Sequence, residues 1–205
     1  MTTLAVMKAR IADEVMRDDL TSQIATAISD AIKFYQKKRF YLNEKDEITF
    51  STVASQSEYG AAANSLIPYL YKIDWMTENG DFVRQISNEM YRDLMETPSS
   101  GEPYHYVYFQ QKIRLYPTPS AVYEIRIQAH YKLAEPASDD EADNPWMTDA
   151  EELIRHRAKM LLWRDIILDP EKATICAGAE MAAFDSLKAI SGTMTGTGML
   201  VPTVF

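Results

Sequence analysis

The chain of 205 residues contains a single cysteine, Cys176, and no long apolar run. With one cysteine, an intrachain disulfide and a cysteine-rich zinc site are both excluded. A transmembrane helix needs about 18 consecutive apolar residues, and no such stretch occurs. Residues Met1–Arg10 lack the apolar segment of a signal peptide. We therefore expect a protein that folds in a reducing cytosol and contacts no membrane.

Basic residues are also fewer than acidic ones. The chain has 21 Lys and Arg against 30 Asp and Glu, which gives a net charge of −9. Gripping nucleic acid requires clustered Lys and Arg, so sequence-specific nucleic-acid binding is not expected. An acidic wall can still border DNA that must slide without sticking. The apolar fraction of 46% is typical of a globular protein with a real core.

Motifs for catalysis or cofactor binding are missing as well. His105, His130 and His156 lack the spacing of a helical metal site, so we interpret them as surface histidines. There is no Gly-x-Ser-x-Gly nucleophile elbow and no glycine-rich phosphate loop. Cys176 falls near the apolar stripe of its helix and is expected to be a small buried group. We expect no enzyme activity, no cofactor and no metal.

One acidic cluster, from Asp139 to Asn144, invites a metal hypothesis. An EF-hand loop that began at Asp139 would need Gly and Glu where Asn144 and Ala150 stand. The pattern fails, and a solvated loop ahead of a helix is the favoured interpretation. The candidates for a loop that faces a channel or a neighbouring subunit are Asp139, Asp140, Glu141 and Asp143.

Apolar residues spaced by three and four predict two helices at the start of the chain. Thr21 or Ser22 can cap the second helix, and Lys37, Lys38 and Arg39 suit the negative end of its dipole. The two apolar stripes are Leu4, Met7, Ile11 and Val15, then Ile24, Ile28, Ile32 and Tyr35.

From Glu47 the apolar period changes to two, which predicts strands. Residues 47–52 form the first strand and residues 55–64 a loop. Asn79-Gly80 supplies a tight turn, from which residues 82–86 return antiparallel. Residues Tyr71, Ile73 and Trp75 are expected to share the face of the strand before that turn.

The second half of this β section begins after a short helix over residues 88–95 with Ser87 as its cap. A strand with Tyr104, Tyr106 and Tyr108 on one face is followed by a partner that contains Ile113 and Leu115. Residues 123–133 alternate over eleven positions and form the clearest strand in the sequence. We expect these three strands to form a meander.

The end of the chain is helical again. Thr148–Glu151 matches a capping box, the helix Leu153–Leu168 follows, and Asp169-Pro170 opens the last helix. Gly192 is well placed to end it. The expected seam of this last helix is Ala173, Ala177, Met181 and Phe184.

The final stretch, SGTMTGTGMLVPTVF, carries no charged side chain. Ordering such a tail costs about 1–2 kcal/mol per residue, whereas burying a large apolar side chain returns about 1.5–3 kcal/mol. Side-chain contacts to its own subunit are therefore too weak to hold it, and docking on another protein is favoured over a free end. The candidate docking residues are Gly196, Gly198, Met199, Leu200, Val201, Pro202, Val204 and Phe205.

Many of the chain's 12 tyrosines lie in the β section. Tyrosine faces can stack on nucleic-acid bases or on carbohydrate. In an acidic chain without interleaved Arg, sheet packing or a protein interface is favoured. A small-ligand-binding module, or a hydrolase that uses the acidic loop and His130, is the alternative of a different class.

These patterns predict an α+β fold in which N- and C-terminal helix pairs form a helical bundle core with an inserted antiparallel β section. The expected divisions are a helical core at 1–46 and 145–191, a β section at 47–135, an acidic loop at 136–144 and a docking tail at 192–205.

With this layout the chain resembles the head–tail connector (adaptor) proteins of tailed bacteriophages. The first stretch that carries the resemblance is MTTLAVMKARIADEVMRDDLTSQIATAISDAIKFYQKKRFYLNE, two helices and a turn, with the strand EITF after it. The second is YEIRIQAHYKLAEPASDDEADNPWMTDAEELIRHRAKMLLW, where a long strand and an acid-Asn-Pro-Trp loop lead into a helix. The third is the tail segment GTGMLVP.

The resemblance implies a structural virion protein, not an enzyme, that is made in the host cytoplasm and located in the neck of the virion. It implies a ring, usually of twelve copies, that docks on the portal protein, contacts a tail, nozzle or tail-tube protein and surrounds the DNA ejection channel. Relatives dock through a C-terminal segment, here Gly196–Phe205. A tail-completion or tail-terminator ring protein is the alternative within the same class.

Overall fold

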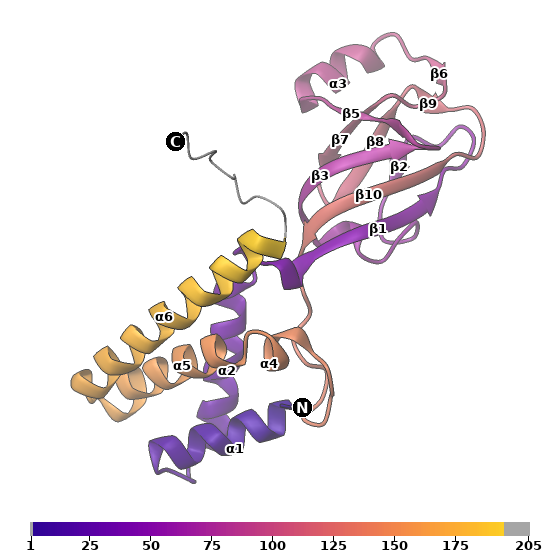
Figure 1. Ribbon diagram of the computed structural model, residues 1–205. Coiled ribbons are helices and arrows are strands. Elements are labelled where there is room, and N and C mark those ends of the chain that lie inside the picture. Colours follow the sequence, from indigo (N-terminus) through magenta and orange to yellow (C-terminus); the bar gives the residue numbers. More distant parts are fainter. Residues whose placement is uncertain (1, 195–205) are drawn as a thin grey trace, which may run out of the picture. The chain divides into compact units, whose positions relative to one another are not determined.

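The computed structural model describes residues 2–194. The α+β class predicted from the sequence is confirmed, with helices at both ends of the described chain and strands in its middle (Figure 1). The chain forms two compact units. Of the described residues, 2–42 and 133–194 make the first unit, and 43–132 make the second.

The first unit is helical, and α5 contacts α1, α2 and α6 within it (Figure 1). The apolar stripes predicted for the first two helices are confirmed, because Met7, Ile11 and Val15 of α1 and Ile24 and Ile28 of α2 are all buried. The elements are α1 (Leu4–Val15), α2 (Thr21–Tyr35), α4 (Pro145–Thr148), α5 (Glu151–Leu162), the π-helical turn η3 (Trp163–Ile167) and α6 (Pro170–Met194).

The starts of α2 and α5 differ from the prediction. α2 follows Leu20 and has no side-chain cap, so Thr21 lies inside the helix. The capping box predicted at Thr148 is also wrong, because Asn144 caps α4 and its Oδ1 accepts the N–H of Trp146 at 3.1 Å. Asn before Pro is the stronger start signal, since the amide side chain satisfies one free N–H and proline removes another.

Toward the C-terminus, some helix boundaries agree with the prediction and others differ from it. The helix expected over 153–168 is α5 followed by η3, and Leu168 ends it in the left-handed region with φ of 61°. Asp169 opens α6 as predicted, accepting the N–H of Lys172 at 3.1 Å. Gly192 does not end α6, which continues to Met194. A glycine inside a helix costs only about 1 kcal/mol, too little to stop it here.

The buried side of α6 is rotated away from the predicted seam. Met181 is 62% exposed, Ala177 is exposed and Phe184 is only half-buried. Glu180 lies inside instead, although a charged residue would ordinarily be placed on the solvent side. The buried residues of α6 are Ala173, Cys176, Glu180, Leu187 and Ser191.

The second unit contains two four-stranded sheets. Sheet A has the order β1-β10-β3-β4 and sheet B the order β2-β8-β7-β5. The strands of sheet A are β1 (Glu44–Ser51), β3 (Leu70–Glu78), β4 (Asp81–Phe82) and β10 (Glu124–Tyr131), and those of sheet B are β2 (Glu58–Tyr59), β5 (Arg84–Gln85), β7 (His105–Phe109) and β8 (Lys112–Tyr116).

Smaller elements complete this unit. A parallel pair joins β6 (Ser100–Gly101) to β9 (Thr118–Pro119), and two 3-10 turns, η1 (Tyr41–Asn43) and η2 (Ile67–Tyr69), precede β1 and β3. Helix α3 (Asn88–Met95) forms as predicted, with Ser87 Oγ accepting the N–H of Met90 at 3.1 Å.

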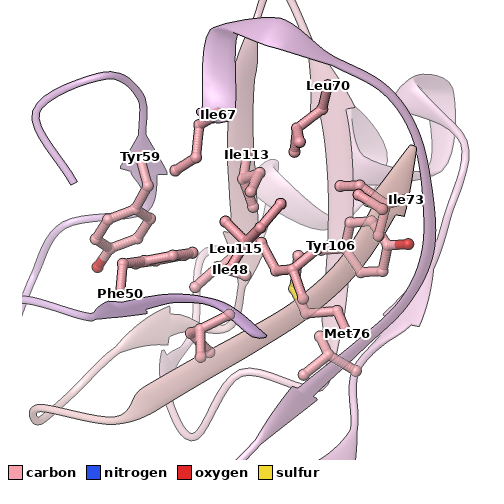
Figure 2. Packing of buried hydrophobic residues seen from close by; sticks show 14 residues of the cluster. Ile48, Phe50, Tyr59, Ile67, Leu70, Ile73, Met76, Tyr106, Ile113 and Leu115 are labelled. Atoms are coloured by element: carbon pink, nitrogen blue, oxygen red, sulfur yellow. The ribbon is translucent and has the colours of Figure 1, made fainter. Parts of the chain in front are cut away.

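The core of the second unit lies between the two sheets. Figure 2 shows Ile48, Phe50 and Met76 of sheet A directed toward Ile113 and Leu115 of sheet B. Where a strand keeps its period-two alternation, every second side chain enters this layer. The remaining buried members are Tyr59, Ile67, Leu70, Ile73, Val83, Tyr106, Ile125, Ile127 and Ala129.

The predicted meander is wrong, because the strands divide between the two sheets. β7 and β8 form an antiparallel pair as expected, but β10 lies between β1 and β3 in the other sheet. The section is not purely antiparallel either, since β5 pairs parallel with β7 and β6 with β9. The segment expected to be a loop, 55–64, contains the short strand β2.

The turn at Asn79-Gly80 is confirmed, with φ of 44° and 104°. The returning strand is shorter than predicted: Asp81–Phe82 pairs with β3, and Arg84–Gln85 joins sheet B instead. The side chains of β3 also do not alternate as expected. Two register shifts against β10 turn Ile73 and Met76 inward and leave Trp75 half-buried on the other face.

Candidate interaction surfaces

The predicted docking segment, Gly196–Phe205, lies outside the described residues. The structure describes the helix that leads to it, α6, whose Ser191 is buried and hydrogen-bonded to the backbone N–H of Tyr41 at 3.2 Å. The last turn of α6 is therefore part of the folded unit, and a docking segment would start after Met194.

The outward side of α6 has no charge over about three turns. From Ala173 to Phe184 the only charged residue is Glu180, and it is buried. Two large apolar side chains project from this side, Ile175 at 66% and Met181 at 62% exposure. A Cβ added to Gly178 between them would meet no described atom within 4 Å. A helix side that lacks charge and exposes large apolar side chains is typical of a surface that packs on another protein.

A groove of about 340 Å³ between α2 and α6 adjoins this side. Phe34 of α2 is 48% exposed and Met181 of α6 borders the same hollow. The guanidinium of Arg157 lies 3.9 Å from the centroid of the Phe34 ring, which holds the ring in place by a cation–π contact. The groove is lined by Phe34, Tyr35, Lys38, Ala177, Glu180, Met181 and Phe184.

Polar contacts of Glu180 fix the three helices beneath this groove. The hydroxyl of Tyr35 on α2 donates to Glu180 Oε1 at 2.5 Å, and Arg157 Nη1 on α5 donates to the same oxygen at 3.1 Å. Burial, together with the bond to Glu180, raises the pKa of the Tyr35 hydroxyl, so this group remains a donor. One carboxylate on α6 thus joins α2, α5 and α6.

The acidic loop is held in part by its own unit. Asp139 forms an ion pair with Lys8 of α1 at 2.6 Å, and its carbonyl accepts the N–H of Ala5 at 2.9 Å. The carboxylate of Glu141 accepts from the N–H of Ala137 and from Asn144 Nδ2, and these bonds lower its pKa. Of the four candidate carboxylates, Asp140 and Asp143 are the exposed ones that no hydrogen bond or ion pair described here occupies.

A second charged network ties α1 to α5. Glu14 binds Arg155 at 2.6 Å and Lys159 at 2.5 Å, while Glu151 binds Arg10 at 3.0 Å and Arg155 at 2.9 Å. These contacts with Lys159 and Arg155 outweigh burial and lower the pKa of Glu14. The network fixes α1 on α5. Its charged groups are paired with one another and are therefore less available to bind a partner protein.

The histidines were predicted to lie at the surface, and for His130 this is wrong. His130 is 5% exposed and its ring centroid lies 5.1 Å from that of Tyr71. A register shift in the pairing of β10 with β3 lies next to it, between His130 and Tyr131. Cys176 is buried as predicted, and burial raises the pKa of its thiol.

The described residues contain no cluster of three or more His, Cys, Asp or Glu side chains arranged to hold a metal ion. None of their helices is both long and apolar enough to cross a membrane.

Sequence reasoning missed the outward side of α6 and its groove. The apolar residues Ala177 and Met181 were assigned to the core, because a stripe with helical spacing is usually buried. The signal that could have revealed the surface is the lack of exposed charge between Lys172 and Asp185.

Comparison with known proteins supplies one match. No curated protein matches the chain. The family model of the SU10 adaptor protein matches residues 2–200, which is nearly the whole chain and includes both compact units. The chain therefore belongs to the SU10 adaptor protein family.

Proposed function

We propose that this protein is a structural, non-enzymatic head–tail connector of a tailed bacteriophage, assembled as a dodecameric ring in the neck of the virion. Membership of the SU10 adaptor protein family is the observation that carries the proposal. An adaptor joins two other virion components, so its function resides in surfaces and not in a catalytic centre. The proposed partners are the portal protein on one side and a tail, nozzle or tail-tube protein on the other.

The proposed portal-binding segment is Gly196–Phe205. This segment carries five large apolar residues and no charged side chain, so a partner surface is the most favourable cover for it. It follows directly from the ordered end of α6 at Met194.

The outward side of α6 is the proposed contact between neighbouring copies in the ring. Ala177, Gly178 and Ala182 would allow a neighbouring helix to approach closely, while Ile175 and Met181 would fill gaps in its surface. Burying Ile175 and Met181 fully would contribute about 1.5–3 kcal/mol each. Repetition around a closed ring would multiply that small gain.

Asp140 and Asp143 are the proposed channel-facing charges. The net charge of −9 supports an acidic wall, because repulsion between carboxylates and phosphates lets DNA pass without adhering. Asp139 and Glu141 would instead keep the loop in shape through their contacts to Lys8 and Asn144.

The test is co-assembly with purified portal protein after serine replaces Met199, Leu200, Val201, Val204 and Phe205. We expect loss of the complex in sedimentation and electron microscopy and an unchanged Tm, because residues 2–194 keep their contacts. The matched control replaces Thr195, Thr197 and Thr203 by serine and should assemble normally. Assembly of the apolar-to-serine variant at wild-type concentration would refute docking through this segment.

A further inference from the structure

The outer face of sheet A presents a row of side chains that crosses all four strands. Thr49 of β1 lies opposite Arg126 of β10, Arg126 lies opposite Thr77 of β3, and Thr77 lies opposite Phe82 of β4. Their chain neighbours Phe50 and Ile125 belong to the buried core. Since side chains alternate along a strand, this row faces away from that core.

A hollow of about 510 Å³ lies on this face. Thr77 is short and its cross-strand neighbours Phe82 and Arg126 are long, so the surface is lower at Thr77 than on either side of it. Phe82 is 78% exposed. The lining residues are Trp75, Thr77, Asn79, Gly80, Phe82, Glu124 and Arg126.

Asn79 and Gly80 form the turn that borders the hollow. Gly80 has φ of 104°, and a Cβ at that position would meet no described atom within 4 Å. Asn79 Oδ1 accepts the N–H of Glu124 at 3.4 Å, which ties the turn to β10 and turns the amide nitrogen away from that bond. The size of the hollow lies within the range of about 300–1,000 Å³ that is usual for small-molecule sites.

Arg126 and Glu124 place hydrogen-bond donors and acceptors side by side along one wall of the hollow, and Glu47 contacts Arg126 from outside the lining. Arg126 Nη1 lies 3.6 Å from Glu47 Oε1, and Arg126 Nη2 lies 3.4 Å from Glu124 Oε1. These loose, exposed pairs leave lone pairs on both carboxylates and N–H groups on the guanidinium for a ligand. Trp75 and Phe82 supply aromatic faces in the same hollow.

The charges of this wall decide which ligand it fits. A phosphate or other anion would meet Glu124, with Glu47 close behind Arg126, and a cationic side chain would meet Arg126. A wholly apolar ligand would strip water from three charged groups and return no hydrogen bond. A neutral ring with an apolar face and a rim of hydroxyl groups satisfies the aromatic faces and the mixed polar wall together.

We propose that this hollow is a binding site for a neutral saccharide. One sugar ring lies with its C–H face against Trp75 or Phe82. Its hydroxyl groups accept from Arg126 and Asn79 and donate to Glu124. This activity is additional to the connector function and needs neither the ring nor the C-terminal segment.

The test is calorimetric titration of the full-length protein with maltohexaose, cellohexaose, chitohexaose and a mannan hexasaccharide, each up to about 20 mM. We expect saturable binding of at least one probe with a Kd of about 0.1–5 mM. Trp75→Ala and Arg126→Gln should each weaken it about tenfold or more, because the first removes an aromatic face and the second removes a charged donor from the site. Saturation-transfer NMR on the sugar protons gives a second readout that does not depend on tryptophan fluorescence.

Tyr104→Ala is the matched control, because Tyr104 is an exposed aromatic residue of the same unit, at 52%, that does not line the hollow. It should bind like the wild type. Arg126→Gln tests the site without removing an aromatic residue from the sheet, and an unchanged Tm shows that it folds. The proposal is overturned if no probe binds saturably, or if Tyr104→Ala weakens binding as much as Trp75→Ala does. It is equally overturned if Trp75→Ala abolishes capture of a purified virion protein and the saccharides do not compete.

Discussion

Each compact unit contains a buried glutamate, Glu180 in the helical unit and Glu78 in the β unit, and the surroundings of the two are opposite. In the helical unit Glu180 is 7% exposed and accepts from Tyr35 and Arg157. In the β unit Glu78 is 1% exposed, and its Oε1 has no hydrogen-bond partner among the described residues. The pKa of Glu78 is raised to about 7. The main cause is burial, followed by the hydrogen bond and charge of Glu102 and then by the charge of Asp81.

The difference shows what holds each unit. The helices have narrow apolar stripes, and ion pairs complete the contacts between α1, α5 and α6, while the hydrogen bond from Tyr35 joins α2 to Glu180. The sheets instead share one continuous apolar layer, which tolerates a poorly matched carboxyl at its margin. A change of glutamate to glutamine should therefore destabilise one unit and stabilise the other.

The largest effect is expected for Glu180→Gln. Arg157 would lose its carboxylate partner and Tyr35 its charged acceptor, which should reduce the free energy of unfolding of the helical unit by about 2–4 kcal/mol. Urea denaturation measures the loss, and hydrogen exchange should show it in α2, α5 and α6. Asp185→Asn, an exposed acid-to-amide change on the same helix, is the control and should be neutral. A loss below about 0.5 kcal/mol would contradict the role of this carboxylate.

Glu78→Gln should act in the opposite direction and depend on pH. The folded pKa of Glu78 lies above its ordinary value of 4.5, so its stabilising contribution is complete below about pH 4.5 and is lost as the pH rises through about 7. The variant does not titrate. It should therefore exceed the wild type by roughly 2–3 kcal/mol at pH 8 and by little at pH 4.5.

The measurement is the Tm of both proteins from pH 4.5 to pH 8. Glu96→Gln, an exposed change in the same unit, should leave the wild-type pH profile as it is. Equal gains at both ends of the pH range would mean that packing, and not the charge of Glu78, is responsible.

The smallest effect is expected for Lys8→Ala. Its ion pair with Asp139 is exposed on the carboxylate side, at 57%, so the loss should be at most about 1 kcal/mol at low salt and should vanish at about 1 M salt. The backbone bond from Ala5 to Asp139 would keep the loop on α1. Tm at the two salt concentrations measures the effect, and a loss that salt does not change would show that packing of the lysine stem matters more.

Sequence reasoning succeeds for features set by neighbouring residues. The stripes of α1 and α2, the Ser87 cap, the Asn79-Gly80 turn and the start of α6 at Asp169 each depend on a few adjacent positions. The division of strands into two sheets depends on partners far apart in the chain, such as β1 and β10. No local pattern specifies that pairing.

The surfaces were harder to predict than the elements that carry them. Trp75 is two residues after Ile73, so regular alternation predicts that both side chains share one face. The register shifts of β3 place them on opposite faces, with Trp75 lining the hollow. On α6, a charged residue such as Glu180 is ordinarily expected to face solvent. It is buried and paired with Arg157, and Met181, which was expected to be buried, is exposed. The role of Gly196–Phe205 remains a prediction.

The place of the β unit in the chain has a consequence for synthesis. α1 and α2 are complete before any of residues 43–132 are made, while their partner α5 comes after them. At the usual elongation rate, those roughly 90 residues take about 5–20 s. During that interval Met7, Ile11, Ile24, Ile28 and Ile32 have no α5 to cover them. At its end the β unit has its complete set of strands, whereas α5 has still to be made. The inserted unit can thus mature first on the ribosome, and the nascent N-terminal helices are the segment that chaperones must protect.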